Sequence, residues 1–390
     1  MLKIFCSFLS NIATGPDNRG KEFFLAFMEN ASMKRYLEIL VTTPCKHDVI
    51  VRLTAPKWPA ANLNKTFVVK PGTTKRIAFS NSLRLTGTGL SSKAVHLAAD
   101  DEIVVITVNR EDYTIGTCLA LPVDVLGTAH FAVSYSPASN KCQVAVVGTR
   151  DHTDVDITLP SVMTVPVQLG DNSTYYGGET FRITLNAFDT FQLQSSGDLT
   201  GAKIVSSKPV SVFSGNVRTI VGGGISYDHI VEQLAPADTW GTVFITTPTP
   251  NRTTGDFFKI VSCQDNTSLV FNLALDNSSA AGQSETTYLL ENAGDFVQVR
   301  IPSKTYVCLR STKPIQVFQI VLSQMSRYSD EEADPSLTVI PPVYQWMSDY
   351  YFATPSLGTE SFDNFVSLVV ESTQRAGVLL NGVNSLPSSV

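Results

Sequence analysis

The sequence is poor in charge and has no long apolar run. Charged residues make up 16% of its 390 residues and the formal net charge is −6, whereas typical soluble domains contain about 25% charged residues. An acidic chain without a basic face is a poor match for nucleic acid. No apolar run reaches the roughly 18 residues that a membrane-spanning helix requires. We therefore predict neither a nucleic-acid partner nor a membrane span.

The usual motifs of catalysis and metal binding are also missing. The five histidines, at positions 47, 96, 130, 152 and 229, form no His-Glu-x-x-His motif, and no Gly-x-Ser-x-Gly elbow occurs. The glycines at 222–224 precede neither Lys-Ser nor Lys-Thr, so they predict a flexible surface loop and no phosphate site. We predict no catalytic, cofactor-binding or metal-binding residues.

Three polar groups have a functional and a structural interpretation. The run 151–156 contains three aspartates and one histidine but lacks the central glycine of a Ca²⁺ loop, so we favour a polar hairpin. The acidic run 330–334 fits a solvated loop better than a cation site. His229 and Glu232 would suit an acid/base pair, but we favour a structural joint that also includes Leu234 and Trp240.

The chain does contain a long internal repeat. Pro122, Pro236 and Pro342 each stand five positions before a matching point, at Gly127, Gly241 and Met347. A second landmark, Lys-Pro followed by an apolar run, occurs at 208–213 and 313–318, and its first copy at 101–106 has Asp-Glu in place of Lys-Pro. A fixed long period indicates tandem modules. We expect Ile103, Val210 and Ile315 to occupy equivalent strand positions.

The repeat divides the chain into three complete modules of about 106 residues and the start of a fourth. Residues 1–17 fit either a short signal peptide or the remnant of an upstream segment. The expected divisions are 1–17, module 1 at 18–117, module 2 at 118–230, module 3 at 231–343 and an incomplete module 4 at 344–390.

Short runs of Val, Ile, Thr and Phe, separated by Gly, Pro, Asn and Asp, predict strands throughout. In module 1 we expect strands near 23–27, 36–42, 49–54, 67–70, 75–79, 94–97 and 102–108. The fold class is all-β, with tandem antiparallel β-sandwich-like modules. The alternative is a pair of four-stranded, propeller-like blades per module.

The cysteines and the glycosylation sequons bear on whether the protein is secreted. Cys118 with Cys142, and Cys263 with Cys308, fall within single modules and are expected to form disulfides; the alternative is free, buried thiols. Cys45 has no evident partner except Cys6. Six Asn-x-Ser/Thr sequons are candidates for N-glycosylation, at Asn30, Asn64, Asn172, Asn251, Asn266 and Asn277.

The repeat landmarks resemble the N-terminal domain of the IgG Fc-binding protein family. The resemblance covers nearly the whole chain and is strongest at 197–201, 207–215, 228–234 and 240–242. Family members commonly carry a Cys pair in the loop that here spans 216–228, and this loop contains none.

The resemblance implies a secreted, extracellular, non-enzymatic module that needs no cofactor. It would act in protein or glycoprotein recognition in mucus, matrix or at a surface, with an immunoglobulin-like or mucin-like partner. It does not by itself establish binding of Fc. The alternative function is a carbohydrate-active enzyme or its accessory carbohydrate-binding module, which in the case of a glycosidase would need two carboxylates in a cleft.

Overall fold

A computed structural model describes residues 17–32, 34–136, 141–275, 285–326, 334–354, 365–380 and 383–384. The expected signal peptide or remnant and the sequon at Asn277 lie outside these residues, apart from position 17. The described part is nearly all β, as predicted, and contains only short 3-10 helices. Among the described residues, no helix combines the length and apolar character required to cross a membrane.

Module 1 forms two four-stranded antiparallel sheets that share one long strand. The strands are β1 (Gly20–Leu25), β2 (Leu37–Thr42), β3 (Val49–Thr54), β4 (Asn64–Val69), β5 (Lys75–Phe79), β7 (Val95–Arg110) and β8 (Ile115–Leu119). The first half of β7 pairs with β1 and β3, and its second half pairs with β2 and β8. The seven expected strands are present at these places, but the last two are continuous in β7.

Module 2 repeats the plan with the long strand divided in two, and its last strand crosses the boundary that we expected at 230. Its strands are β9 (Ala129–Phe131), β10 (Cys142–Gly148), β11 (Thr153–Thr158), β14 (Thr180–Leu185), β15 (Thr190–Ser195), β16 (Lys203–Ser206), β17 (Val210–Thr219) and β18 (Asp228–Gln233), with a small hairpin of β12 (Val167–Gln168) and β13 (Thr174–Tyr175). One sheet has the order β14-β11-β16-β9. The other is β18-β17-β10-β15-β6, in which β6 (Gly89–Ser91) comes from module 1. Module 1 therefore completes a sheet of module 2.

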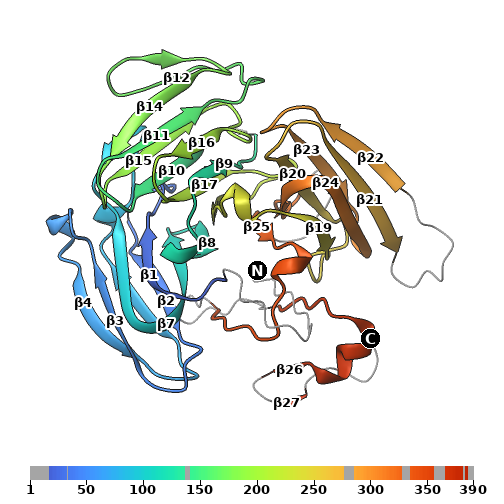
Figure 1. Cartoon of the computed structure of the whole chain (residues 1–390), viewed down its shortest axis with the longest axis horizontal. Helices are drawn as coiled ribbons and strands as arrows, with labels where there is room; N and C mark the ends of the chain where they lie inside the picture. The colour runs from blue at the N-terminus through green and yellow to red at the C-terminus, as the bar shows by residue number, and fades with distance from the viewer. Residues whose placement is uncertain are drawn as a thin grey trace.

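Module 3 returns to one long strand, β24. Its strands are β19 (Gly241–Thr246), β20 (Asp256–Ser262), β21 (Thr267–Leu275), β22 (Glu285–Leu290), β23 (Phe296–Ile301), β24 (Thr305–Ile320) and β25 (Leu337–Ile340). The remaining elements are η1 (Pro59–Ala61), η2 (Asn81–Leu83), η3 (Val123–Val125), η4 (Ala237–Thr239), η5 (Val343–Gln345), η6 (Ser372–Gly377), β26 (Leu379–Leu380) and β27 (Val383–Asn384). Figure 1 shows the three sheet systems side by side, in blue, green and orange.

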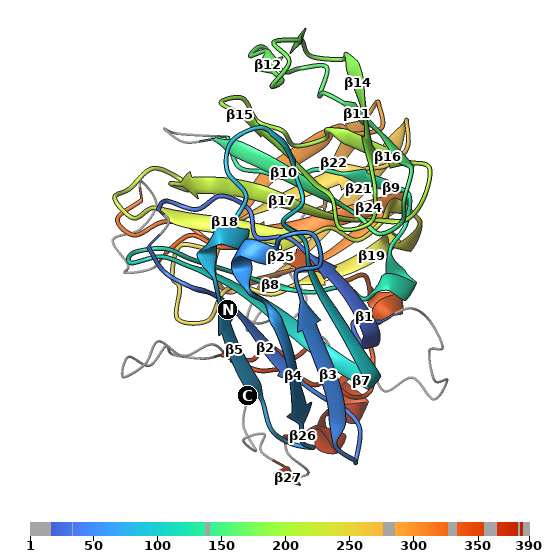
Figure 2. The same cartoon turned by 90° about the vertical axis from the view of Figure 1, so that its left-hand side faces the viewer.

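The two sheets of a module enclose a common core, as in a sandwich. Val51 of β3 and Ile39 of β2 belong to different halves of module 1, yet both are fully buried in one cluster. The strand order β4-β3-β7-β1 interleaves distant segments, whereas a propeller blade is usually a sequential meander. In the side view of Figure 2, β3 and β4 of module 1 cross the direction of β17 and β18 of module 2 at a steep angle.

The glycine that opens each module packs against the proline of the joint that closes it. A Cβ added to Gly20 would lie 2.3 Å from the Cβ of Pro122. The same contact recurs between Gly127 and Pro236 and between Gly241 and Pro342, at 2.4 Å in both cases. Real Cβ atoms essentially never approach this closely, so each position requires glycine. The same contact between glycine and proline thus recurs in all three modules.

Ile103, Val210 and Ile315 occupy equivalent positions, as predicted. Ile103 pairs with Gly20 and Ile315 pairs with Gly241, in each case across a bulge in the opening strand. The backbone N–H of Val210 donates to the carbonyl of Gly127 at 3.1 Å. All three face the opening glycine of their module.

Candidate functional site

The joint between modules 2 and 3 is built from buried apolar side chains. Residues Asp228–Gln233 form β18, which pairs with β17. Ile230, Val231, Leu234 and Trp240 are at most 7% exposed, which is typical of packed core. The indole N–H of Trp240 donates to the carbonyl of Ala235 at 3.1 Å, and its ring lies against Phe131. This segment is packed between its neighbours and is not a ligand platform.

His229 and Glu232 serve different neighbours. The two are three positions apart on one strand, so their side chains leave opposite faces of the sheet. The Nδ1 of His229 contacts the carbonyl of Asn216 at 2.8 Å, and burial lowers the pKa of the imidazole to about 4. Glu232 accepts the N–H of Val339 at 3.2 Å, and burial raises its pKa to about 8. This arrangement supports a structural joint and contains no acid/base pair between the two.

The structure does not contain the expected disulfide between Cys118 and Cys142. Both are free thiols, and burial raises the pKa of each to about 12. Cys142 lies in β10, which pairs with β17, and β17 in turn pairs with β18. Gly116 of β8 packs against His229 and Val231 of β18. Two strands therefore separate Cys118 in β8 from Cys142 in β10, which is too far for a disulfide.

The expected disulfide between Cys263 and Cys308 is also wrong, because both are free thiols. Cys263 directly follows β20, whose last residue, Ser262, pairs with Ile315. Cys308 lies seven residues away from Ile315 along β24, or roughly 20 Å at the usual rise of a strand. Both cysteines belong to module 3. They lie in different sheets, however, because the two halves of the long strand β24 pair with different strands.

The sequon at Asn30 is not a glycosylation site in this fold. Asn30 is 4% exposed; its amide donates to the carbonyl of Asn109 at 3.0 Å and accepts the hydroxyl of Thr114 at 2.6 Å. A glycan would disrupt both bonds. The sequons at Asn64, Asn172, Asn251 and Asn266 are exposed and remain candidates.

Loops that follow equivalent strands of the three modules meet at one surface. We define the hairpin surface as residues 111–114 after β7, 220–227 after β17 and 321–326 after β24. Directly after the first two loops, the N–H of Ile115 donates to the carboxylate of Asp228 at 2.7 Å, which holds the ends of these loops together. The N–H of Ile225 donates to the carbonyl of Gln324 at 3.1 Å, which joins the second and third. The three loops are thus connected into one unit.

The glycine run of the second loop is packed, contrary to the flexible loop that we expected. Gly224 has a φ of 115°, and a Cβ there would lie 2.4 Å from the carbonyl oxygen of Gln324. Val221 and Ser323 exchange two further hydrogen bonds, at 2.8 and 3.1 Å. The glycines therefore let two modules approach closely at their backbones.

Each loop of the hairpin surface presents one large exposed apolar or aromatic side chain. Tyr113 is 88% exposed, Ile225 is 62% exposed and Met325 is 51% exposed. Sequence reasoning did not single out these residues, because Ile225 stands fifteen positions after Val210, whereas Tyr113 and Met325 stand ten positions after Ile103 and Ile315. Exposed side chains of this kind, one on each of three connected loops, suit contact with another protein.

A surface hollow of about 450 Å³ lies elsewhere, beside the turn at 248–253 with Lys304 and Tyr306. Its lining residues include no Asp or Glu. It therefore lacks the pair of carboxylates that a glycosidase of the usual kind requires.

Comparison with known proteins gives the family. The family model described as IgGFc binding protein matches residues 116–389, which is more than half of the chain. The chain is also 28% identical to the human protein named IgGFc-binding protein over 372 residues. That match covers 94% of this chain and 6% of the relative, so the chain spans only a small part of that protein's length. On this evidence the chain belongs to the IgGFc-binding protein family.

Proposed function

We propose that this chain is a non-enzymatic module that binds another protein or a glycoprotein outside the cell, in mucus, in matrix or at a surface. The observation that carries the proposal is the hairpin surface, where Tyr113, Ile225 and Met325 are exposed on three connected loops. The family membership supports a binding role, since the human relative is named for binding IgGFc. That name makes the Fc part of immunoglobulin G the first ligand to test, and a mucin the second.

The loops support binding because they are held in place before a partner arrives. The hairpin at 111–114 is closed by the N–H of Glu111, which donates to the carbonyl of Thr114 at 2.8 Å. Behind it, the carboxylate of Glu111 forms a fully buried ion pair with Arg84. A surface that is already ordered loses little conformational entropy on binding, so more of its contact energy appears as affinity. Tyrosine in particular offers a large contact area with few rotatable bonds.

The test is direct binding of immobilised Fc, and separately of a purified mucin, by the full chain. A triple variant, Tyr113→Ser with Ile225→Ser and Met325→Ser, should bind the recognised partner at least about tenfold more weakly, since burial of such side chains contributes about 1.5–3 kcal/mol each. The matched control is Val162→Ser with Leu289→Ser, which removes exposed apolar side chains from other places.

Equal binding by the triple variant and the wild type would contradict the hairpin surface as the binding site. Failure of the wild-type chain to bind either ligand would contradict the proposed recognition of immunoglobulin or mucin.

A further inference from the structure

The loop that precedes β3 in module 1, β11 in module 2 and β21 in module 3 has the same construction in all three. A short polar side chain of the loop contacts the carbonyl of the residue just before the equivalent positions Ile103, Val210 and Ile315. In module 1 the Sγ of Cys45 lies 3.7 Å from the carbonyl oxygen of Glu102. In module 2 the hydroxyl of Thr149 contacts Pro209 at 2.5 Å, and in module 3 the Sγ of Cys263 contacts Pro314 at 3.4 Å. These contacts align the three loops residue by residue.

In modules 2 and 3, a lysine ammonium closes this loop. Lys208 donates to the carbonyl of Asp151 at 2.6 Å, and Lys313 donates to the carbonyl of Asp265 at 2.5 Å. Both aspartates stand two positions before the strand that follows, β11 or β21. A positive charge therefore sits at the same place in both modules.

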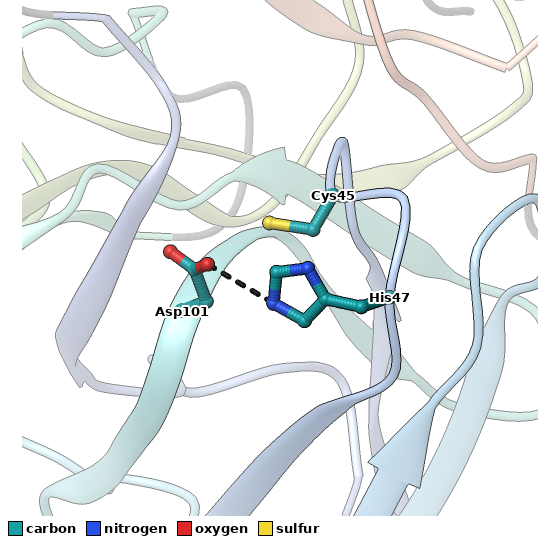
Figure 3. Close-up of side chains that lie close together, drawn as sticks. All are labelled: Cys45, His47 and Asp101. Carbon is teal, nitrogen blue, oxygen red and sulfur yellow. Dashed lines mark ion pairs between the residues drawn. The ribbon is translucent and has the colours of Figure 1, made fainter.

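Module 1 has lost that lysine. Asp101 stands at the lysine position, two residues before Ile103, and His47 stands at the aspartate position, two residues before β3. The Nε2 of His47 lies 3.1 Å from a carboxylate oxygen of Asp101. One donor atom each from Cys45, His47 and Asp101 lies within 4.8 Å of the others. Figure 3 shows the three side chains close together, with the imidazole paired to Asp101.

We propose that Cys45, His47 and Asp101 form a Zn²⁺ site in module 1. Thiolate sulfur, imidazole nitrogen and carboxylate oxygen are the ligands that Zn²⁺ prefers, at about 2.0–2.3 Å from the metal. Tetrahedral ligands at such distances lie roughly 3–4 Å from one another, which is close to the spacing seen here. The metal adds positive charge at the place where Lys208 and Lys313 supply it in the other modules. Three protein ligands leave a fourth position for water or for a ligand from a partner.

The backbone holds both sides of the site in place. Thr43 donates its hydroxyl to the carbonyl of Glu102 at 2.7 Å and accepts the N–H of Cys45 at 3.1 Å. Lys21 is the one competing cation that contacts Asp101 among the described residues, at 3.1 Å. It contacts Oδ1, whereas the histidine contacts Oδ2, so the oxygen that faces the imidazole is not shared with the lysine.

The experiment titrates the full chain with Zn²⁺ by calorimetry and with Co²⁺ by absorption. The wild type should bind one equivalent, and Co²⁺ should give the charge-transfer band of a thiolate ligand. Cys45→Ser should abolish that band, and Asp101→Asn should weaken Zn²⁺ binding at least about tenfold. The matched control is Cys263→Ser, which alters the equivalent thiol of module 3 and should leave both readouts unchanged.

A second variant tests whether the three positions are sufficient. Asp265→His with Lys313→Asp gives module 3 the donor set of module 1 around Cys263, so the chain should then bind two equivalents of Zn²⁺. Circular dichroism verifies that each variant is folded. Persistence of the cobalt–thiolate band in Cys45→Ser, unchanged affinity in Asp101→Asn, or only one equivalent in the redesigned chain would overturn the proposal.

Discussion

The interface between modules 1 and 2 adds several amide side chains to a shared apolar cluster, whereas the interface between modules 2 and 3 buries one cation within its shared apolar core. At the first interface, Gln192 donates to the carbonyl of Gly87 at 2.8 Å and accepts the N–H of Glu29 at 3.2 Å. Gln143 donates to the carbonyl of Glu29 at 2.9 Å. The strand pairing of β6 with β15 completes this contact. Several hydrogen bonds, each of modest strength, therefore stabilise this interface together.

The second interface places residues of both modules in one apolar core, among them Phe131 of module 2 and Phe318 of module 3. Within it, Lys259 is 1% exposed, and its ammonium contacts the carboxylate of Asp198 at 3.0 Å and the carbonyl of Ser134 at 2.7 Å. The comparison teaches that a repeat fixes the fold of each module but not the chemistry between modules. An interface that relies on one buried charge should be more sensitive to a single substitution than one that relies on several amides.

The largest effect is expected from Asp198→Ala. This change leaves the ammonium of Lys259 buried without its counter-charge, and breaking such a pair typically costs about 3–5 kcal/mol. Urea unfolding followed by tryptophan fluorescence measures the loss in the free energy of unfolding. The control is Asp156→Ala, which removes an exposed partner of Arg182 and should have a much smaller effect. Equal losses in the two variants would contradict the role given to the buried pair.

Leu234→Ala should have the next largest effect. Leu234 is 2% exposed in the core that modules 2 and 3 share, and removing a buried leucine side chain costs about 2–5 kcal/mol. The same unfolding measurement applies, with Leu90→Ala as the exposed control. A loss below about 1 kcal/mol would show that the joint is not packed core.

Glu232→Gln should change how stability depends on pH. Burial raises the pKa of Glu232 from 4.5 to about 8, so the folded chain binds a proton that the unfolded chain has released between these values. This contribution to stability is full below pH 4.5 and is lost as the pH rises through about 8. As the pH rises through this range, the free energy of unfolding of the glutamine variant should therefore increase by roughly 1–3 kcal/mol relative to that of the wild type. Parallel pH profiles of the two proteins would disprove the shift.

The smallest effect is expected from Gln192→Ala at the first interface. It leaves the N–H of Glu29 and the carbonyl of Gly87 without their partner, for a cost of about 1–2 kcal/mol. Because the strand pairing and Gln143 remain, the unfolding transition should stay single. A loss as large as that of Asp198→Ala would remove the proposed difference between the interfaces.

The sequence predicted what depends on local pattern. The strands of module 1, the all-β class and the equivalence of Ile103, Val210 and Ile315 follow from alternation, turn residues and the repeat. The disulfide predictions were wrong because the spacing of cysteines along the chain does not indicate which sheet each half of a long strand joins. Strand β6 was missed because three residues that pair with another module carry no periodic signal.

The repeat alone could have drawn attention to Asp101, one of the three proposed metal donors. Asp101 aligns with two lysines, and such a change of charge at a repeated position is visible in the sequence. What the alignment lacks is the loop geometry, which brings Cys45 and His47 to the same aspartate. The exposed side chains of the hairpin surface needed the fold for the same reason, since connected loops are far apart in the chain.

The donation of β6 to the sheet of module 2 has a consequence during synthesis. The ribosome makes Ser91 almost a hundred residues before Thr190, its partner in β15. When β15 leaves the ribosome, β6, which pairs with its free edge, has therefore already been synthesised. Uncovered edges are where nascent chains pair wrongly with one another. A fragment that starts at module 2 would lack this cover, and it should aggregate more readily than the whole chain.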